Sequence, residues 1–218
     1  MTRASGIQTG QERAPTTRIQ KRNRKDILEA AIEVIAEMGF DGARMETISE
    51  RSGVSRTNIH YYFRTKEDLH REVIGCVLEV WGGLWAALDE NGSPGEELAK
   101  YVTGKLRASW RYPELSRIFA AEIIRGAPLV ENHIRTDMKK TFDGACKTLK
   151  RWMDQGHILK ADPAHVFFLI WSSTQYYADF NLVLSILMNK SEMDEIDYDA
   201  AEKTISKIVL ESLILTRD

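Results

Sequence analysis

Residues 46–63 read Glu46-Thr47-Ile48-Ser49-Glu50-Arg51-Ser52-Gly53-Val54-Ser55-Arg56-Thr57-Asn58-Ile59-His60-Tyr61-Tyr62-Phe63. The pattern predicts a short helix, a tight turn at Gly53 and a second short helix, because glycine supplies the backbone freedom that such a turn needs. Ser55 can cap the second helix by accepting a hydrogen bond from an amide of its first turn. Ile59 and Phe63 lie four residues apart and can face inward together. This is the pattern of a helix-turn-helix, whose second helix lies in the major groove of DNA.

The outer face of the second helix carries candidate DNA contacts. Arg56 and Thr57 lie in its first turn, from which base edges are usually reached. The other candidates lie on the same helix or flank the two helices: Arg44, Ser55, Asn58, His60, Tyr61 and Lys66. An ordinary helical hairpin with a polar outer face fits the same residues, so the pattern alone leaves DNA binding open.

Charge is distributed unevenly along the chain. Residues 1–66 carry 12 Lys/Arg and 8 Asp/Glu, whereas residues 67–218 carry 18 Lys/Arg and 24 Asp/Glu. The formal net charge of −2 therefore combines a basic N-terminal part with an acidic body. Such asymmetry favours attraction of phosphate groups to one end of the molecule, and it strengthens the DNA-binding interpretation.

Composition and motifs exclude several classes of protein. The most apolar segments are too short and too charged to span a bilayer, and residues 1–17 lack a signal-peptide pattern, so we expect a cytoplasmic protein with no membrane contact. Cys76 and Cys146 have no metal-ligand spacing, and we expect both to be reduced. No phosphate loop, dinucleotide motif, zinc motif or nucleophile–base grouping occurs. We therefore expect no enzyme activity, no cofactor and no bound metal.

Helical periodicity and helix-breaking residues predict an all-α fold with nine helices. Residues 1–17 are polar and expected to be disordered, residues 18–64 form a three-helix DNA-binding domain, and residues 65–218 form a helical body for ligand binding and dimerisation. Thr65 is expected to cap a long helix, and Ser93 with Glu96 to form a capping box before the next. Asp162 and Pro163 open a strongly apolar helix that continues to about residue 188. The last helix is expected at about residues 198–215.

Several short motifs occur in a fixed order along the chain: Ile48-Ser49, Ser52-Gly53-Val54-Ser55, Ile59-His60, Tyr62-Phe63 and Lys66-Glu67-Asp68-Leu69. In this order they resemble the TetR family of one-component transcriptional regulators. The chain departs from the family pattern at Thr57, where glycine is common, and at His60, where tyrosine is common. Further motifs resemble the RutR-like branch of pyrimidine-utilisation regulators: residues 55–58, 111–119, 126–129 and 170–180.

The resemblance implies a DNA-binding transcriptional regulator, expected to be a repressor, that binds a palindromic operator as a homodimer. It also implies that a small-molecule effector changes the separation of the two recognition helices. In this family pattern, Tyr61 and Lys66 hold DNA phosphates rather than read bases. RutR-like members respond to uracil or thymine, which makes a pyrimidine the first candidate effector. The alternative is the same fold sensing a hydrophobic or cationic compound, as a multidrug-efflux-type regulator.

Trp171 and Gln175 are the strongest candidates for effector binding. They lie four residues apart on one predicted helix, so both project from the same side. The Gln175 amide offers one donor and one acceptor, which can pair with the adjacent N–H and C=O of a pyrimidine. The further candidates around them are Trp81, Trp110, Phe119, Thr174 and Asp179. We attribute Trp85 and Trp152 to core packing.

The two C-terminal helices, at about 163–188 and 198–215, are expected to form a four-helix bundle with the same helices of a second copy. The stripe predicted to face that copy consists of Ile205, Ile208, Val209, Ser212 and Leu213.

Overall fold

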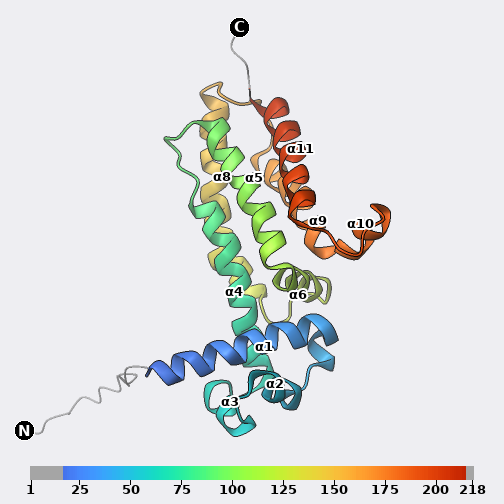
Figure 1. Cartoon of the computed structure of the whole chain (residues 1–218). Coiled ribbons are helices and arrows are strands. Elements are labelled where there is room, and N and C mark those ends of the chain that lie inside the picture. The colour runs from blue at the N-terminus through green and yellow to red at the C-terminus, as the bar shows by residue number, and fades with distance from the viewer. Residues whose placement is uncertain (1–16, 215–218) are drawn as a thin grey trace, which may run out of the picture.

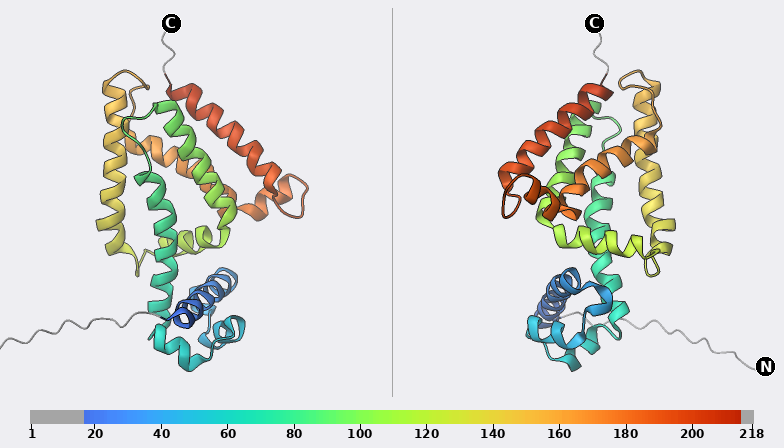
Figure 2. Two further views of the ribbon diagram at one scale, coloured as in Figure 1. Left: turned by 60° about the vertical axis from the view of Figure 1, so that its left-hand side comes forward. Right: turned by 90° about the vertical axis from the view of Figure 1, so that its right-hand side faces the viewer.

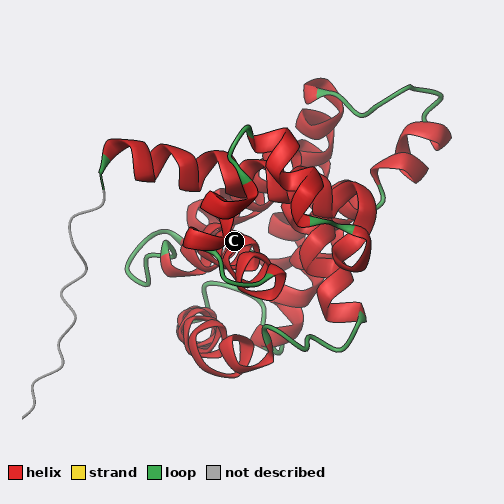
Figure 3. Cartoon of the chain, turned by 90° about the horizontal axis from the view of Figure 1, so that it is seen from below, coloured by secondary structure: helices red, strands yellow, loops and turns green. Residues whose placement is uncertain are grey.

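The computed structural model describes residues 17–214, a part of the chain that is helical except for its loops and one isolated bridge between Ile158 and Ile214 (Figure 3). The helices are α1 (Arg18–Gly42), α2 (Met45–Ser52), α3 (Arg56–Tyr62), α4 (Lys66–Ala86), α5 (Pro94–Arg111), α6 (Pro113–Ile124), α7 (Glu131–His133), the π-helical segment η1 (Ile134–Met138), α8 (Lys139–Asp154), α9 (Pro163–Asp179), α10 (Asn181–Leu187) and α11 (Glu195–Leu213). None of the helices between residues 17 and 214 is long and apolar enough to cross a membrane.

The predicted all-α class is confirmed, but the predicted number of nine helices is wrong. α7, η1 and α8 follow one another without a gap and correspond to one predicted helix. The additional helix arises because the predicted helix at 163–188 is divided into α9 and α10. Phe180 leaves the helical conformation, with φ −118° and ψ 26°, and α10 starts directly after it. Neither glycine nor proline marks this break, so it has no local signal in the sequence.

Side-chain caps are present at the start of α1, α3, α4, α9 and α11. The predicted cap at Thr65 is confirmed, since its hydroxyl accepts a hydrogen bond of 3.0 Å from the Asp68 amide. The predicted cap at Ser93 is wrong, because that side chain makes no capping bond. The loop before α5 is instead held by Glu97, whose carboxylate accepts from the Asp89 amide at 3.1 Å. α11 begins three residues earlier than predicted, because Asp194 forms a capping box there.

α1, α2 and α3 form a small unit at one end of the molecule, and α4 runs from this unit into the body (Figures 1 and 2). The core of the small unit contains Ile27, Val34, Ile48 and Ile59, all fully buried. Val73 on α4 belongs to the same core. The N-terminal part of α4 is therefore packed into the small unit, and a displacement of α4 would be passed on to α2 and α3.

The body contains a second core, formed mainly by α5, α8, α9 and α11. Its fully buried side chains include Leu98, Leu149, Trp152 and Phe167. The predicted core role of Trp152 is confirmed, and its indole N–H donates to the Glu90 carbonyl at 3.2 Å. Trp85, near the C-terminal end of α4, is also buried in this core. α4 thus connects the two cores along its length.

Candidate DNA-binding surface and effector site

α3 is held in place by the turn that precedes it. Gly53 adopts φ 68°, in the left-handed region that glycine tolerates best. Ser49 Oγ donates to the Val54 carbonyl at 2.7 Å and closes the turn. Ser55 caps α3 by accepting from the Asn58 amide at 3.4 Å, as predicted. Ile59 is buried beneath the helix, so the opposite face of α3 points away from the core.

The outer face of α3 carries most of the predicted DNA contacts, all of them exposed: Ser55, Arg56, Thr57, Asn58, His60 and Tyr61. Tyr61 is the most prominent, with 72% of its surface accessible. Arg56 forms an ion pair with Glu46 on α2, and a DNA phosphate or base would compete with that carboxylate. Arg44, directly before α2, is exposed as well. This surface lies at the end of the molecule farthest from the body (Figure 1).

Lys66 has a different environment from the other predicted contacts. Its ammonium donates to the carbonyls of Phe40 at 2.8 Å and Ala43 at 3.1 Å, and it lies 4.5 Å from the centre of the Phe40 ring. Lys66 therefore ties the start of α4 to the C-terminal end of α1. Its ammonium already donates hydrogen bonds to backbone carbonyls, so the predicted phosphate contact does not fit this geometry.

We expect Lys66→Met to lower the free energy of unfolding by about 1–2 kcal/mol, because carbonyls at the end of α1 lose a charged donor. It should leave the salt dependence of DNA binding unchanged. Arg44→Met is the matched control: it should leave thermal stability unchanged and reduce the salt slope by about one phosphate contact. Thermal denaturation and DNA binding by fluorescence anisotropy at several salt concentrations test both variants. A reduced salt slope for Lys66→Met would instead support the predicted contact between Lys66 and a DNA phosphate.

A cluster of aromatic side chains occupies the centre of the body. The ring centre of Trp81 lies 4.9 Å from that of Phe119 and 6.4 Å from that of Trp171, and both pairs meet edge to face. The Trp171 ring is also 5.0 Å from that of Trp85. Three predicted effector-binding residues are therefore brought together from α4, α6 and α9. Trp81 and Trp171 touch directly, so a ring could enter between them only if one of them moved.

Lys105 on α5 is part of this cluster, and sequence analysis missed it. Its side chain is 1% exposed, and the ammonium lies 4.6 Å from the ring centre of Trp81 and 5.2 Å from that of Trp171. Among the residues that the structure describes, the ammonium has no hydrogen-bond partner. Burial lowers the pKa of Lys105 to about 7, although the charge of Asp179 opposes this change. The burial of Lys105 could have been predicted from sequence, since Leu98, Tyr101 and Lys105 are spaced as one inward helix face.

Gln175 and Asp179 lie one turn apart at the edge of the cluster. With Phe119 and Trp171 they line a cavity of about 610 Å³ between α6 and α9. Asp179 accepts a hydrogen bond of 2.6 Å from Ser116 Oγ. Burial raises the pKa of Asp179, and hydrogen bonds from Ser116 and Gln175 oppose that rise. Gln175 is thus placed where its amide can meet a ligand that enters this cavity.

Two predicted effector residues have their principal contacts elsewhere. The Thr174 side chain is fully buried, and its hydroxyl donates to the Ile170 carbonyl at 2.7 Å within its own helix. Trp110 lies beside α11, with its ring centre 6.2 Å from that of Tyr198. The part of these two residues in effector binding therefore stays a prediction from sequence.

Two family models match the chain, one over the DNA-binding unit and one over the body. Residues 27–73 match the family described as bacterial regulatory proteins, tetR family, and residues 74–216 match the YcdC-like protein, C-terminal region. The chain is 34% identical over 190 residues to the HTH-type transcriptional regulator RutR of Escherichia coli strain K12, covering 87% of this chain and 90% of that protein. The chain belongs to the TetR family. It is a DNA-binding transcriptional regulator.

Solved structures of TetR-family regulators share its fold. PfmR from Thermus thermophilus superimposes with a TM-score of 0.70 at 16% identity, covering 88% of this chain and 99% of that one. AibR, solved with isovaleryl coenzyme A and operator DNA, gives a TM-score of 0.68 at 15% identity, covering 87% and 99%. At these identities the likeness concerns the fold alone.

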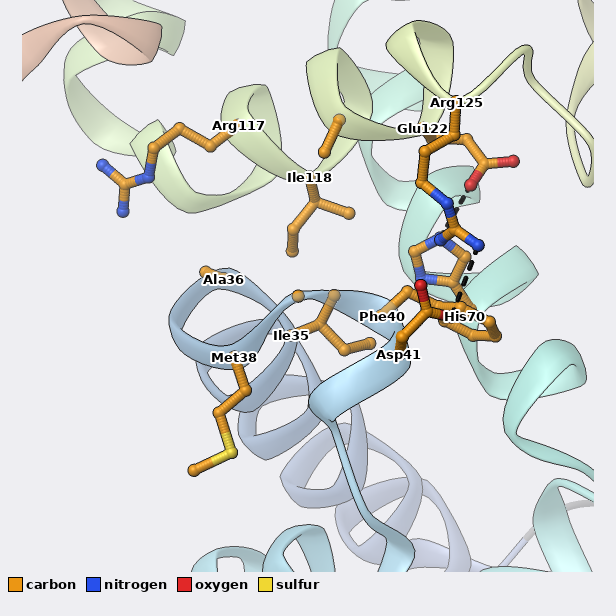
Figure 4. Close-up of a pocket in the computed structure, with 12 residues that line it drawn as sticks. Ile35, Ala36, Met38, Phe40, Asp41, His70, Arg117, Ile118, Glu122 and Arg125 are labelled. Carbon is orange, nitrogen blue, oxygen red and sulfur yellow. Dashed lines mark hydrogen bonds and ion pairs between the residues drawn. The ribbon is translucent and has the colours of Figure 1, made fainter.

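In this TetR-family chain, the junction between the DNA-binding unit and the body is a polar contact among α1, α4 and α6 (Figure 4). His70 on α4 and Glu122 on α6 are almost completely buried, with His70 Nε2 and Glu122 Oε2 3.3 Å apart. Burial lowers the pKa of His70, while Glu122 opposes this change. The Phe40 ring of α1 lies 4.6 Å from the His70 ring. His70 and Trp81 share α4, which therefore joins this junction to the aromatic cluster.

Proposed function

We propose that this TetR-family regulator binds a palindromic operator as a homodimer and that a flat pyrimidine-like molecule, with uracil as the first candidate, controls that binding. Residues 18–64 act as the DNA-binding domain, and residues 65–218 bind the effector and form the dimer. The protein acts in the cytoplasm, and its expected role is that of a repressor. The observation that carries the proposal is the aromatic cluster beside Gln175, because one of its members, Trp81, is on α4, the helix that leads to the DNA-binding unit.

DNA recognition is divided between the two ends of α3. Arg56 and Thr57 lie in the first turn, where side chains of a recognition helix reach base edges. Tyr61 lies near the end of the helix and suits a phosphate contact, which fixes register without reading sequence. The exposure of all three side chains supports their contact with DNA.

Dimerisation through α9 and α11 is supported by apolar side chains that the protomer leaves uncovered. On α9, Phe168, Leu169 and Tyr176 are 46%, 62% and 44% exposed. The stripe expected on α11 needs correction, because Ile205, Val209 and Leu213 are buried in the protomer's own core. The exposed ridge of α11 instead carries Ile196, Ala200, Thr204, Ile208 and Ser212. Residues spaced by four form the ridges through which helices pack.

A flat polar ring suits the effector site better than the alternative cationic compound. Trp81 and Trp171 offer aromatic planes, and Gln175 offers a donor and an acceptor on one amide. The ammonium of Lys105 lies between the two tryptophans and repels a cation from the same place. The relative RutR is a regulator of the same family at 34% identity, which supports a pyrimidine as the first compound to test.

Titration of the protein–operator complex with uracil, thymine and their reduced derivatives tests this proposal. We expect at least one of them to displace the DNA, because an effector must bind the non-DNA-binding conformation more tightly to shift the equilibrium. Fluorescence anisotropy of labelled operator is the measurement, and ribose at the same concentration is the control. If none of the pyrimidines changes DNA affinity, the proposed effector class is wrong.

A further inference from the structure

The aromatic cluster contains several buried polar atoms that have no hydrogen-bond partner within residues 17–214. They are Lys105 Nζ on α5 and Trp171 Nε1 on α9, with Ser109 Oγ one turn further along α5. Lys105 and Ser109 are four residues apart, so they lie on the same side of α5. Buried polar groups are nearly always paired in native proteins, because leaving one unpaired costs free energy. Unpaired groups gathered in one place indicate a bound molecule that pairs with them.

These atoms are mostly donors. An ammonium and an indole N–H can only donate, whereas a serine hydroxyl can donate or accept. The nearby acceptor Asp179 is already engaged, since it takes hydrogen bonds from Ser116 and Gln175. A ligand that pairs with these donors must therefore supply acceptor oxygens. A ring substituent that is itself a donor, such as an exocyclic amino group, would face donors and remain unpaired.

We propose that Lys105 determines effector specificity by donating to an oxygen of a planar ring, so that the site accepts oxo- or carboxylate-substituted rings and rejects their amino-substituted counterparts. This inference rests on the proposed effector site and adds the substituent that the site recognises. The side chain is 1% exposed, and its ammonium lies 5.2 Å from the ring centre of Trp171, which lines the cavity between α6 and α9, so a ring that enters from this cavity and lies against Trp171 comes close to it.

The charge of Lys105 provides a second means of discrimination. The free protein holds this ammonium at a pKa of about 7, because burial disfavours the charged form. An oxygen acceptor stabilises that form, so a bound oxo ring should raise the pKa of Lys105 and draw a proton from solution at about pH 8. Asp179 on α9 is the charged group that acts on Lys105 and also favours the ammonium. Tyr101, one turn earlier on α5, stays neutral because burial raises its pKa. α4 and α6 contribute Trp81 and Phe119, which do not titrate.

The test is calorimetric titration with pairs of planar compounds in which amino groups replace the oxygens: uracil and 2,4-diaminopyrimidine, hypoxanthine and adenine, benzoate and benzamidine. For the unmodified protein, we expect the oxygen-bearing member of a pair to bind at least about tenfold more tightly, since one unpaired buried group is worth that much. Lys105→Met should weaken that member by about tenfold to a hundredfold and remove the preference. Measuring the heat in two buffers of different ionisation enthalpy should show proton uptake at about pH 8, and Lys105→Met should abolish it.

Lys100→Met is the matched control, because Lys100 is also on α5 but its side chain is 69% exposed. It should leave affinity, preference and proton uptake unchanged. Lys105→Gln provides a second variant that keeps an N–H donor without charge. It should retain part of the preference but show no proton uptake. Thermal denaturation checks that every variant is folded.

The outcomes separate this inference from the proposed function. If only benzoate binds, and does so in a manner that depends on Lys105, the pyrimidine proposal fails and the specificity role of Lys105 stands. The specificity role is overturned if the amino-substituted member binds as tightly as its partner, or if the preference survives in both Lys105 variants. Failure of every compound to bind overturns both proposals.

Discussion

Replacing Leu169 and Ile208 with glutamate should convert the proposed dimer into a monomer and lower operator affinity by about a hundredfold or more, because linking two half-site contacts raises affinity by that order. Leu169 on α9 and Ile208 on α11 are 62% and 61% exposed in the protomer. In the proposed four-helix bundle each would be buried against the second copy. A carboxylate there loses its hydration without gaining a partner, which is costly for any buried charge.

The protomer itself should tolerate the double substitution, since both side chains point away from its core. Light scattering coupled to size-exclusion chromatography measures the mass, and anisotropy with labelled operator measures the affinity. Ile124→Glu is the control, because Ile124 on α6 is 85% exposed and lies outside α9 and α11. A double variant that keeps the dimeric mass at micromolar concentration would show that the two copies associate through another face.

The DNA-binding unit was the part of the fold most accessible from sequence. Gly53, Ser55 and Thr65 act within a few residues of their own positions, through a left-handed turn and two helix caps. Such local signals can be read without knowledge of the tertiary structure. The failed predictions had no such local basis. Ser93 is the N-cap residue of α5 but its side chain makes no capping bond, and neither glycine nor proline marks the break at Phe180.

The aromatic cluster of the body was predicted only in part for a similar reason. Trp81, Phe119 and Trp171 are large and apolar, so their burial was foreseeable, and the structure brings them together. Periodicity alone does not tell which side of an apolar helix faces its own core, and this explains the error at Ile205, Val209 and Leu213. A lysine was not considered for the interior, because lysines are almost never fully buried. The spacing of Lys105 with the buried residues Leu98 and Tyr101 nevertheless marked it as a member of an inward helix face.

Replacing Gln175 with leucine should abolish displacement of operator DNA by the effector while leaving operator affinity itself nearly unchanged. In the proposed complex the Gln175 amide pairs with an N–H and a C=O of the ring. Leucine has a similar size but cannot form either bond, and each unpaired group costs about 1–3 kcal/mol in a water-poor site. Loss of both bonds corresponds to at least about a thirtyfold weaker effector, since about 1.4 kcal/mol is a factor of ten. α3 lies in the DNA-binding unit, outside the body that contains α9, and keeps its contacts (Figure 1).

Gln175 also supports the ionised form of Asp179, so the variant could act indirectly through that carboxylate. Ser116→Ala separates the two explanations, because it removes the 2.6 Å hydrogen bond to Asp179 and leaves Gln175 in place. A direct role predicts that Ser116→Ala still releases DNA at effector concentrations that fail with Gln175→Leu. Titration of the operator complex of each variant, together with calorimetric measurement of effector binding, provides the comparison. Equal loss in both variants would assign the effect to Asp179, and an unchanged response in Gln175→Leu would place effector recognition elsewhere in the body.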